Sequence, residues 1–347
     1  MIETVELCPG YCISRVVKGG WQLAGGHGPV DRGAALADMA AYVEAGITAF
    51  DCADIYTGVE ELIGDFNRGR RGGTRLRVHT KFVPDLGALP TMDRAYVTRV
   101  IDRSLLRLGV ERLDLVQFHW WDYAAPRMVE TALWLVELQR AGKIELLGGT
   151  NFDTPTTQAL LDAGVPVATM QVQYSVLDRR PEQALGALAR RRGIGLLCYG
   201  TVAGGFLSDA WLGRPEPDAP ENRSLAKYRL IIEDFGGWVL FQTLLRTLRD
   251  SADRHGVDIA SVATRHVLDQ PGVAATIVGV RNRAHLAAHA RLFDFALDDA
   301  DRAGIDAVLS RAQPVEGDIY TLERDHDGRH GRIMKYNLGD APSPIPS

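Results

Sequence analysis

Ile47-Thr48-Ala49-Phe50-Asp51 is a short apolar run that ends in a carboxylate, and two later runs follow the same pattern. Arg77-Val78-His79-Thr80-Lys81 ends in an amine, and Leu113-Asp114-Leu115-Val116-Gln117-Phe118-His119 ends in an imidazole. Runs without strict polar/apolar alternation are typical of parallel strands that are buried on both faces. Because α/β barrels keep their chemistry at strand ends, these terminal side chains predict a site.

The same alternation of an apolar run and an amphipathic segment extends in both directions, from about residue 13 to about residue 295. Glycines such as Gly46, Gly109 and Gly142 stand where helices should stop, and another apolar run follows each of them closely. We expect strands at residues 13–17, 47–51, 77–81, 113–119, 144–151, 167–173, 194–199 and 274–280. We expect helices to begin near Asp31, Glu60, Met92, Arg127, Thr154, Pro181, Gly237 and Asn282.

Eight such strands and eight helices predict a single closed (β/α)8 TIM barrel, which is an α/β fold. The alternative is an open, doubly wound sheet. That fold carries G-x-G-x-x-G after its first strand, whereas Gly19-Gly20 and Gly25-Gly26 have the wrong spacing. We therefore expect one domain over residues 1–347, in which residues 13–312 form the barrel together with an extra helix at residues 298–311.

Three segments fall outside the strand–helix repeat. Residues 1–12 contain Pro9-Gly10 and predict a short hairpin that covers one end of the barrel. Residues 205–235 follow the seventh strand and include several prolines, which predicts a long loop. The C-terminal extension, residues 313–347, mixes aromatic and charged residues and ends in a polar stretch that we expect to fray.

The composition is that of an ordinary globular protein, with 46% hydrophobic and 24% charged residues among 347. The net charge of −5 gives no reason to expect nucleic acid or an acidic membrane as a partner. No signal peptide or apolar stretch of about 18 residues is visible, so we expect a cytoplasmic protein without a membrane span. Cys8, Cys12, Cys52 and Cys198 lack partners at metal-ligand spacing, so we expect no metal site.

Tyr56 adds a phenol to the carboxylate of Asp51, the amine of Lys81 and the imidazole of His119. A free tyrosine has a pKa of about 10 and is a poor acid at neutral pH, but an adjacent ammonium lowers that pKa. The carboxylate would keep the lysine charged, and the imidazole would orient a carbonyl oxygen. This set suits a general acid that protonates a carbonyl oxygen while a cofactor delivers hydride to the carbon.

Each of these four residues also has an ordinary structural explanation when it is taken alone. Asp51 could cap a helix, Tyr56 could pack as an aromatic, Lys81 could point to solvent, and His119 could satisfy hydrogen bonds in the core. Their common position at successive strand ends of one barrel favours the catalytic interpretation.

At this point the chain resembles the aldo-keto reductase superfamily, from about residue 13 to about residue 306. The resemblance rests on six short motifs that occur in the order and at the spacing of that family. These motifs are Phe50-Asp51-Cys52-Ala53-Asp54-Ile55-Tyr56, Thr80-Lys81-Phe82, Gln117-Phe118-His119-Trp120, Gly148-Gly149-Thr150-Asn151-Phe152, Gln171-Val172-Gln173-Tyr174-Ser175 and Cys198-Tyr199-Gly200.

The resemblance implies that Tyr56 donates the proton, that Lys81 and Asp51 tune it, and that His119 positions the substrate carbonyl. It also implies an extended nicotinamide cofactor that lies across the strand ends without a Rossmann domain. The cofactor contacts that it assigns are Gly20, Trp21, Asp51, Thr150, Asn151, Gln171, Tyr199, Gly200, Thr201, Gly279, Arg281 and Arg283.

The resemblance also assigns roles within that set. Asn151 and Gln171 would hydrogen-bond the carboxamide of the cofactor, and Tyr199 would stack on its nicotinamide ring. Thr150 stands where the family usually has serine. Residues 205–235 would fold over the bound cofactor, as loops on this face of a barrel often do.

The segment after the eighth strand bears on the adenosine end of the cofactor. A helix that starts near Asn282 offers free backbone N–H groups to an anion, and Arg281 and Arg283 could add charged hydrogen bonds to a phosphate. This favours NADPH over NADH, with NADH as the alternative. Val278 and Ala288-His289 depart from the Pro and the Glu-Asn that are common in the family, which leaves the adenine contacts open.

Three tryptophans are candidates for the substrate wall. Trp21 follows the first strand, and Trp120 and Trp121 follow His119 directly. Indole rings there would form an apolar surface for a carbon chain or ring, although only one of two consecutive residues can easily face the site. The C-terminal extension has three possible roles: a lid over the substrate, a contact with a partner subunit, or packing without function.

The favoured function is an NADPH-dependent carbonyl reductase that acts on a small carbonyl compound, or the reverse alcohol or sugar dehydrogenase. A second possibility is a regulatory or binding subunit that uses nicotinamide as a redox sensor. A third is a barrel isomerase or lyase that acts through Lys81 without nicotinamide. The sequence leaves the physiological substrate, the direction of the reaction and the oligomeric state open.

Overall fold

The strands of this protein close into a parallel barrel, as predicted. The computed structural model describes residues 1–25, 28, 30–70, 72–218 and 222–334. Neighbouring strands pair in the order β10-β3-β4-β5-β6-β7-β8-β9, and the pairing of β10 with β3 completes the ring. The barrel strands are β3 (Val16–Gly19), β4 (Ala49–Asp51), β5 (Arg77–Phe82), β6 (Leu113–Phe118), β7 (Ile144–Thr150), β8 (Val167–Gln173), β9 (Gly195–Tyr199) and β10 (Val273–Gly279).

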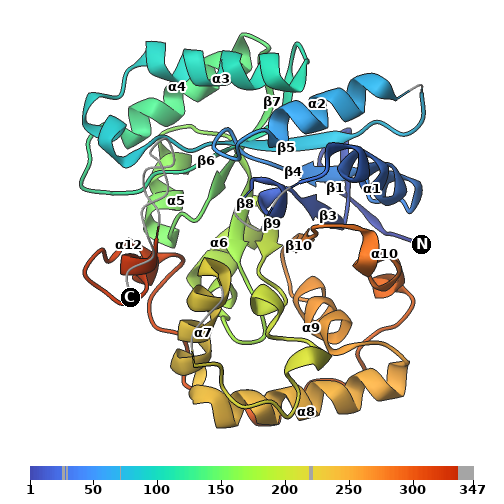
Figure 1. The fold of residues 1–347 in the computed structure, drawn as a ribbon. Coiled ribbons are helices and arrows are strands. Elements are labelled where there is room, and N and C mark those ends of the chain that lie inside the picture. Colours follow the sequence, from blue (N-terminus) through green and yellow to red (C-terminus); the bar gives the residue numbers. More distant parts are fainter. Residues whose placement is uncertain (26–27, 29, 71, 219–221, 335–347) are drawn as a thin grey trace.

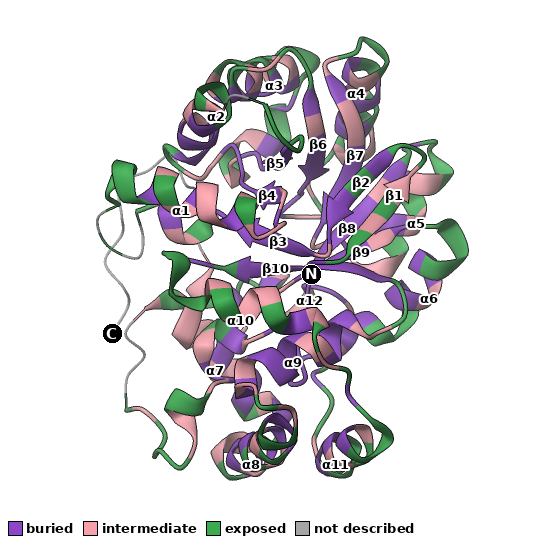
Figure 2. Cartoon of the chain, turned by 90° about the vertical axis from the view of Figure 1, so that its right-hand side faces the viewer, coloured by how far each residue is buried: buried purple, intermediate pink, exposed green. Residues whose placement is uncertain are grey.

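Helices surround the barrel, and their buried faces pack on the strands (Figures 1 and 2). Asp31, Asp93 and Asp153 each accept a hydrogen bond from the backbone of the helix that follows, which explains where these helices begin. The first five predicted helix starts lie within two residues of the observed ones. These helices are α1 (Arg32–Glu44), α2 (Val59–Gly69), α3 (Arg94–Leu108), α4 (Met128–Arg140) and α5 (Thr154–Asp162), and α6 (Ala184–Arg192) follows them.

The N-terminal hairpin is longer than predicted. Antiparallel strands β1 (Thr4–Cys8) and β2 (Tyr11–Ser14) form it, so the run at residues 13–17 is divided between the hairpin and β3. At this division Ser14 Oγ donates to the backbone oxygen of Val16 and accepts hydrogen bonds from the backbone N–H groups of Thr48 and Ala49, which ties the end of the hairpin to the barrel. The apolar pattern alone could not show this break, because residues on both sides of it are buried.

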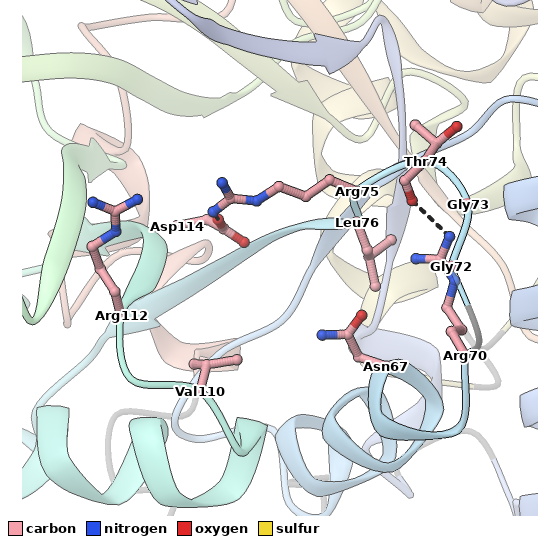
Figure 3. A pocket seen from close by; sticks show the side chains of 10 residues that line it. All are labelled: Asn67, Arg70, Gly72, Gly73, Thr74, Arg75, Leu76, Val110, Arg112 and Asp114. Atoms are coloured by element: carbon pink, nitrogen blue, oxygen red, sulfur yellow. Dashed lines mark hydrogen bonds and ion pairs between the residues drawn. The ribbon is translucent and has the colours of Figure 1, made fainter.

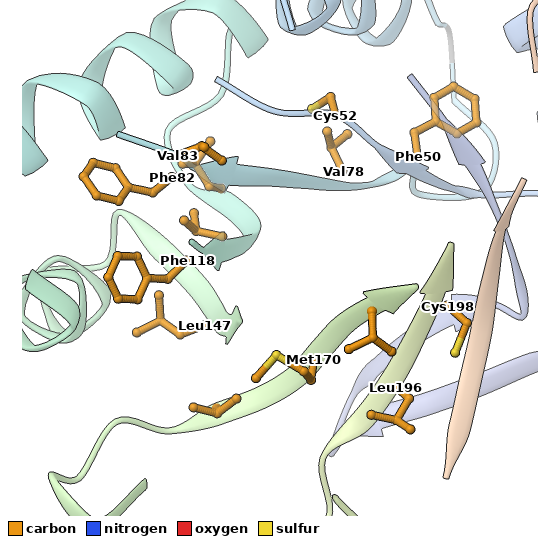
Figure 4. Packing of buried hydrophobic residues seen from close by; sticks show 14 of the residues in the cluster. Phe50, Cys52, Val78, Phe82, Val83, Phe118, Leu147, Met170, Leu196 and Cys198 are labelled. Carbon is orange, nitrogen blue, oxygen red and sulfur yellow. The ribbon is translucent and has the colours of Figure 1, made fainter. Parts of the chain in front are cut away.

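The hairpin covers the amino-terminal end of the barrel. Tyr11 and Ile13 are almost fully buried and belong to one apolar cluster with Val17, Leu115 and Leu197, which lie on barrel strands. A second, larger cluster fills the space between the strands and the helices and includes the side chains drawn in Figure 4. The barrel is therefore filled by side chains, as expected for this fold, and its functional groups can lie only at an end.

The region after β9 differs from the predicted long loop. Among the described residues of its first part, which end at 218, the regular structure is short 3-10 turns, and its second part is the helix α7 (Arg223–Phe235). α7 is followed by α8 (Gly237–His255) and α9 (Ile259–Leu268). The helices α7 and α8 therefore come before α9, which is the helix that leads into β10. Side chains from these helices, among them Phe241 of α8, form one apolar cluster together with Phe206. Burial of this cluster stabilises the folded form of the segment.

The C-terminal region is folded as far as the structure describes it. α10 (Leu286–Ala290) is a short helix where a longer one was expected near Asn282, and α11 (Asp299–Leu309) is the predicted extra helix with a capping box at Asp298. α12 (Thr321–Arg324) lies beyond it in the extension. The stretch 341–347, which we expected to fray, lies outside the described residues. Among the described helices, none is long and apolar enough to cross a membrane.

We predict that Ile13→Ala lowers the free energy of unfolding by about 2–5 kcal/mol, because it removes a buried side chain and leaves a cavity at the base of the barrel. The matched control is Cys12→Ala, an exposed neighbour on the same strand, which should change stability by less than about 0.5 kcal/mol. Urea unfolding of both variants measures the difference. Equal effects would contradict the covering role of the hairpin.

Candidate active site

Asp51 and Lys81 form a buried ion pair at the carboxyl ends of two neighbouring strands. Lys81 Nζ lies 2.7 Å from Asp51 Oδ2 and 2.8 Å from the backbone oxygen of Cys52. The same nitrogen lies 4.9 Å from the centroid of the Tyr56 ring. The structure thus brings together Asp51, Tyr56 and Lys81, three of the four residues that the sequence predicts to be catalytic.

The second carboxylate oxygen of Asp51 is held by two amides. Gln117 Nε2 donates to Asp51 Oδ1 at 3.1 Å, and Gln171 Nε2 donates to the same oxygen at 2.6 Å. Sequence reasoning missed Gln117. It lies two residues before His119 on a strand, and this spacing places both side chains on the same face. The two amides hold the carboxylate in one orientation toward Lys81.

Burial and charge act in opposite directions on these groups. Burial lowers the pKa of Lys81, but the Asp51 carboxylate outweighs it, so the pKa of Lys81 is raised and the amine stays charged. Burial raises the pKa of Tyr56, and the Lys81 ammonium opposes this without cancelling it. Tyr56 is therefore a protonated phenol at neutral pH, the form that can donate a proton.

His119 is buried beside the end of β6, and its backbone N–H donates to Phe82 at the end of β5. Its Nδ1 lies 3.0 Å from the backbone oxygen of Thr150. A carbonyl oxygen can only accept, so this contact places the ring proton on Nδ1 and leaves Nε2 as the free acceptor of a neutral ring. Burial and the charge of Arg324 lower the pKa of His119 to about 3, so the ring is neutral at physiological pH.

The three candidate tryptophans differ in their surroundings. The ring of Trp21, which is partly exposed, lies 5.1 Å from that of Tyr56. The ring of Trp121 lies 4.3 Å from that of His119 in an edge-on arrangement. Trp120 is fully buried and packs on Phe118, so its surroundings are those of a core residue.

The residues expected around the nicotinamide lie together at the ends of β7, β8 and β9. Asn151 has a left-handed backbone conformation (φ 60°), and its Oδ1 accepts a hydrogen bond from the Tyr199 hydroxyl at 2.9 Å. Its backbone N–H donates to the carbonyl oxygen of Gln171. Thr150, which precedes it, holds His119 through its carbonyl oxygen. This arrangement links the cofactor candidates to the catalytic candidates through direct hydrogen bonds.

Three glycines in the predicted cofactor set stand where the backbone has no room for a side chain. A Cβ atom at Gly20 would lie 2.8 Å from the Asp51 carbonyl oxygen, and one at Gly279 would meet the Gln22 amide. Gly200 has a positive φ and lies against the Tyr228 hydroxyl. Thr201 differs from the rest, because its hydroxyl lies 3.2 Å from that of Thr264 on α9 and is buried.

The two candidate phosphate ligands, Arg281 and Arg283, are exposed residues after β10. Arg283 Nε lies 3.7 Å from Asp38 Oδ1 on α1, so this arginine already has an acidic neighbour. The Arg281 guanidinium lies against Gly28, in the segment between β3 and α1. Arg281 is therefore the freer of the two to bind an anion.

The C-terminal extension reaches the catalytic end of the barrel. The Tyr320 ring lies 5.8 Å from that of His119, and Glu323 forms two hydrogen bonds of 3.1 Å with Arg180, which Asp178 also binds. Lys227 on α7 lies 3.8 Å from Glu323, and its Nζ is 5.4 Å from the centroid of the Tyr199 ring. No sequence pattern predicts these contacts, because they join residues that are far apart in the chain.

Two other features could suggest a binding site: a cavity and a group of potential metal ligands. A cavity of about 250 Å³ lies at the amino-terminal ends of β5 and β6, away from the catalytic candidates, beside the Arg75–Asp114 ion pair (Figure 3). His255, Asp298 and Asp301 bring potential metal ligands within 4.8 Å of one another. Both carboxylates already serve in the capping box of α11, and Arg254 pairs with them.

The protein is a closed parallel α/β barrel with a buried lysine–carboxylate pair, a tyrosine and a histidine at its strand ends, a set of groups whose chemistry suits proton transfer. A family model described as "Aldo/keto reductase family" matches residues 15–310. The chain belongs to this family. The predicted family and the predicted fold are both confirmed.

Named relatives agree with this assignment. The chain is 28% identical over 305 residues to aldo-keto reductase YhdN of Bacillus subtilis, which covers 85% of this chain and 90% of the relative. It is 31% identical over 257 residues to flagellar radial spoke protein 5 of Chlamydomonas reinhardtii, covering 62% of this chain but only about half (49%) of that protein. The glycerol dehydrogenase AKR11B4 of Gluconobacter oxydans has the same fold, with a TM-score of 0.77, 24% identity and coverage of 91% and 97% of the two chains.

We predict that His119 makes stability pH-dependent. The unfolded chain binds a proton at this residue below a pH of about 6.5, whereas the folded chain does so only near pH 3, so stability falls as the pH is lowered through this range. His119→Asn should remove about 1 kcal/mol per pH unit from that slope. Urea unfolding between pH 6 and pH 4 measures it, with the exposed His285→Asn as control. An unchanged slope in His119→Asn would contradict a buried, neutral imidazole.

Proposed function

We propose that this protein is an NADP(H)-dependent aldo-keto reductase that interconverts an aldehyde or ketone and the corresponding alcohol. The observation that carries the proposal is the Lys81 ammonium, 2.7 Å from Asp51 and 4.9 Å from the centroid of the Tyr56 ring. This contact sets a protonated phenol beside a fixed positive charge. Membership of the aldo/keto reductase family supports the same chemistry.

The roles of the residues follow from their contacts. The nicotinamide cofactor, when bound, supplies hydride to the carbonyl carbon. Tyr56 transfers its phenolic proton to the carbonyl oxygen, and Lys81 stabilises the phenolate that remains. Asp51 keeps Lys81 charged and in place. In the reverse direction the Tyr56 phenolate takes the hydroxyl proton of the alcohol, so the same residues serve both directions.

His119 borders the reacting oxygen in this proposal. Its Nε2 is buried and has no hydrogen-bond partner among the described residues. With the ring neutral and the proton on Nδ1, Nε2 is an unprotonated nitrogen that can accept a hydrogen bond but cannot donate one. The expected donation from His119 to a carbonyl oxygen requires a second ring proton, which burial disfavours. We therefore assign the donation to the carbonyl oxygen to Tyr56.

The residues at the ends of β7, β8 and β9 fit a nicotinamide carboxamide and ring. Asn151 and Gln171 offer amide groups to the carboxamide, and Tyr199 offers an aromatic face to the ring. Gly20 and Gly279 are assigned to cofactor binding through their positions, directly after β3 and at the end of β10. Thr201 is assigned to cofactor binding through its position after Gly200, since its side chain hydroxyl lies against α9.

We further propose that the protein forms one domain, works in the cytoplasm and binds neither nucleic acid nor membrane. All four cysteines are free, which suits a reducing compartment. The net charge of −5 supports the absence of a nucleic-acid partner.

We predict that Tyr56→Phe lowers kcat for aldehyde reduction by about 100- to 10,000-fold, the usual size of a general-acid contribution, while the Kd for NADPH changes little. NADPH oxidation followed by absorbance with a panel of aldehydes, ketones and sugars measures the loss, and fluorescence titration measures cofactor binding. Full activity in the variant would overturn the assignment of Tyr56. Tight nicotinamide binding without turnover in the unmodified protein would favour a redox sensor instead.

We predict that Arg281→Ala weakens NADPH binding by about 10- to 100-fold, the size of a charged hydrogen bond, and leaves NADH binding nearly unchanged. The reason is that only NADPH carries the additional phosphate. Arg291→Ala, an exposed arginine of the next turn, is the matched control. Equal weakening of both cofactors in Arg281→Ala would refute the phosphate contact.

A further inference from the structure

The cavity of about 250 Å³ at the base of the barrel lies at the end opposite the catalytic candidates (Figure 3). Its walls come from the end of α2, the segment 72–76 that leads into β5, and the residues that lead into β6. Arg70, Arg75 and Arg112 line it, together with the single carboxylate of Asp114. Pockets for drug-sized ligands begin at roughly 300 Å³, so this cavity suits a smaller molecule.

Three guanidinium groups share two carboxylates beside this cavity. Arg75 lies 2.6 Å from Asp114 and 3.2 Å from Glu145. Arg77, which is largely buried, lies 3.2 Å from each of the same two carboxylates. Arg112 lies 3.1 Å from Glu145. One positive charge is therefore left without a counterpart.

Arg70 adds a second positive charge. Its Nη2 donates to the backbone oxygen of Thr74 at 2.6 Å, and its guanidinium lies 5.8 Å from the centroid of the Phe66 ring. Among the described residues, no carboxylate forms an ion pair with it. Glu111 precedes Arg112 in the chain but is not among the residues that line the cavity. Four guanidinium groups and two carboxylates thus leave an excess of two positive charges.

The segment 72–76 also offers backbone donors to the cavity that it lines. Gly72 and Gly73 have positive φ values of 80° and 90°, a conformation that favours glycine. No backbone N–H group of this segment donates a hydrogen bond to another described residue. A Cβ atom at Gly73 would lie 3.5 Å from Arg70 Nη2, so this backbone passes beside the Arg70 guanidinium. Free N–H groups of a glycine-containing loop beside arginines are an arrangement that suits phosphate.

We propose that this cavity binds a dianionic phosphate group, which belongs either to a small phosphate ester or to free phosphate. Guanidinium groups bind phosphate oxygens through paired, charged hydrogen bonds. A phosphate monoester carries a charge of about −1.5 to −2 at pH 7, which matches the excess of two positive charges. A carboxylate would balance only one of them. This inference is independent of the proposed reductase function.

The test is calorimetric titration of the full chain at constant ionic strength with glycerol 3-phosphate, inorganic phosphate and dimethyl phosphate. Because dimethyl phosphate carries one negative charge, we expect it to bind at least about 10-fold more weakly than glycerol 3-phosphate. Tighter binding of glycerol 3-phosphate than of inorganic phosphate identifies an ester as the ligand, and equal binding identifies free phosphate, so both results support the site. No binding of either dianion, or equal binding of dimethyl phosphate, would overturn the proposal.

Arg70→Gln is the most direct variant, because Arg70 has no ion pair whose loss would disturb the fold. It should weaken binding of glycerol 3-phosphate about 10- to 100-fold, the size of a charged hydrogen bond. Arg112→Gln, in the segment before β6, should weaken it as well. The matched control is Arg68→Gln, which removes the same charge from the last turn of α2, where Arg68 pairs with Asp65. Equal weakening in the control and in Arg70→Gln would contradict a specific site.

Arg281→Ala separates this site from the proposed contact with the cofactor phosphate. Arg281 follows β10, whereas the cavity lies at the amino-terminal ends of β5 and β6. Glycerol 3-phosphate should therefore bind to Arg281→Ala as tightly as to the unmodified protein. Loss of its binding in this variant would place the phosphate at the cofactor site and overturn the proposal.

Discussion

The buried contact between Lys81 and Asp51 is the interaction on which the catalytic end of this barrel depends. A charged lysine away from water is tolerable only beside a compensating charge, and Asp51 supplies it while Gln117 and Gln171 hold the second carboxylate oxygen. Removal of either charge would leave the other buried and unpaired. Four strands therefore contribute to one hydrogen-bonded group, and its geometry exists only in the closed barrel.

Much of this end of the molecule could be predicted from the sequence, because it is set by local order. A polar residue at the end of an apolar run lies at the end of a strand, and in a barrel all such ends face the same side. This rule predicts the places of Asp51, Lys81 and His119, whereas the role of Tyr199 rests on the resemblance to the family. Consecutive residues of an extended chain point to opposite faces, so Trp120 and Trp121 are not expected to face the site together. In the structure Trp120 packs on Phe118 and Trp121 lies beside His119.

The missed features depend on contacts between distant residues. Arg180 and Glu323 are separated by 143 positions, and neither lies in a pattern that announces its partner. The division of residues 13–17 between hairpin and barrel was hidden because both halves are buried. The helix α7 was hidden by the prolines that precede it. In each case tertiary packing, and not local propensity, decided the outcome.

The hairpin β1–β2 has one more consequence for an enzyme of this kind. Because side chains fill the barrel and Tyr11 and Ile13 cover its amino-terminal end, small molecules can reach the catalytic candidates only from the carboxyl-terminal end of the strands. Reactant and product then enter and leave by the same opening, and Tyr320 of the C-terminal extension lies beside it. A product that has not yet left would occupy the place that the next reactant needs. The rate of product release therefore limits the rate at which the next reactant can bind.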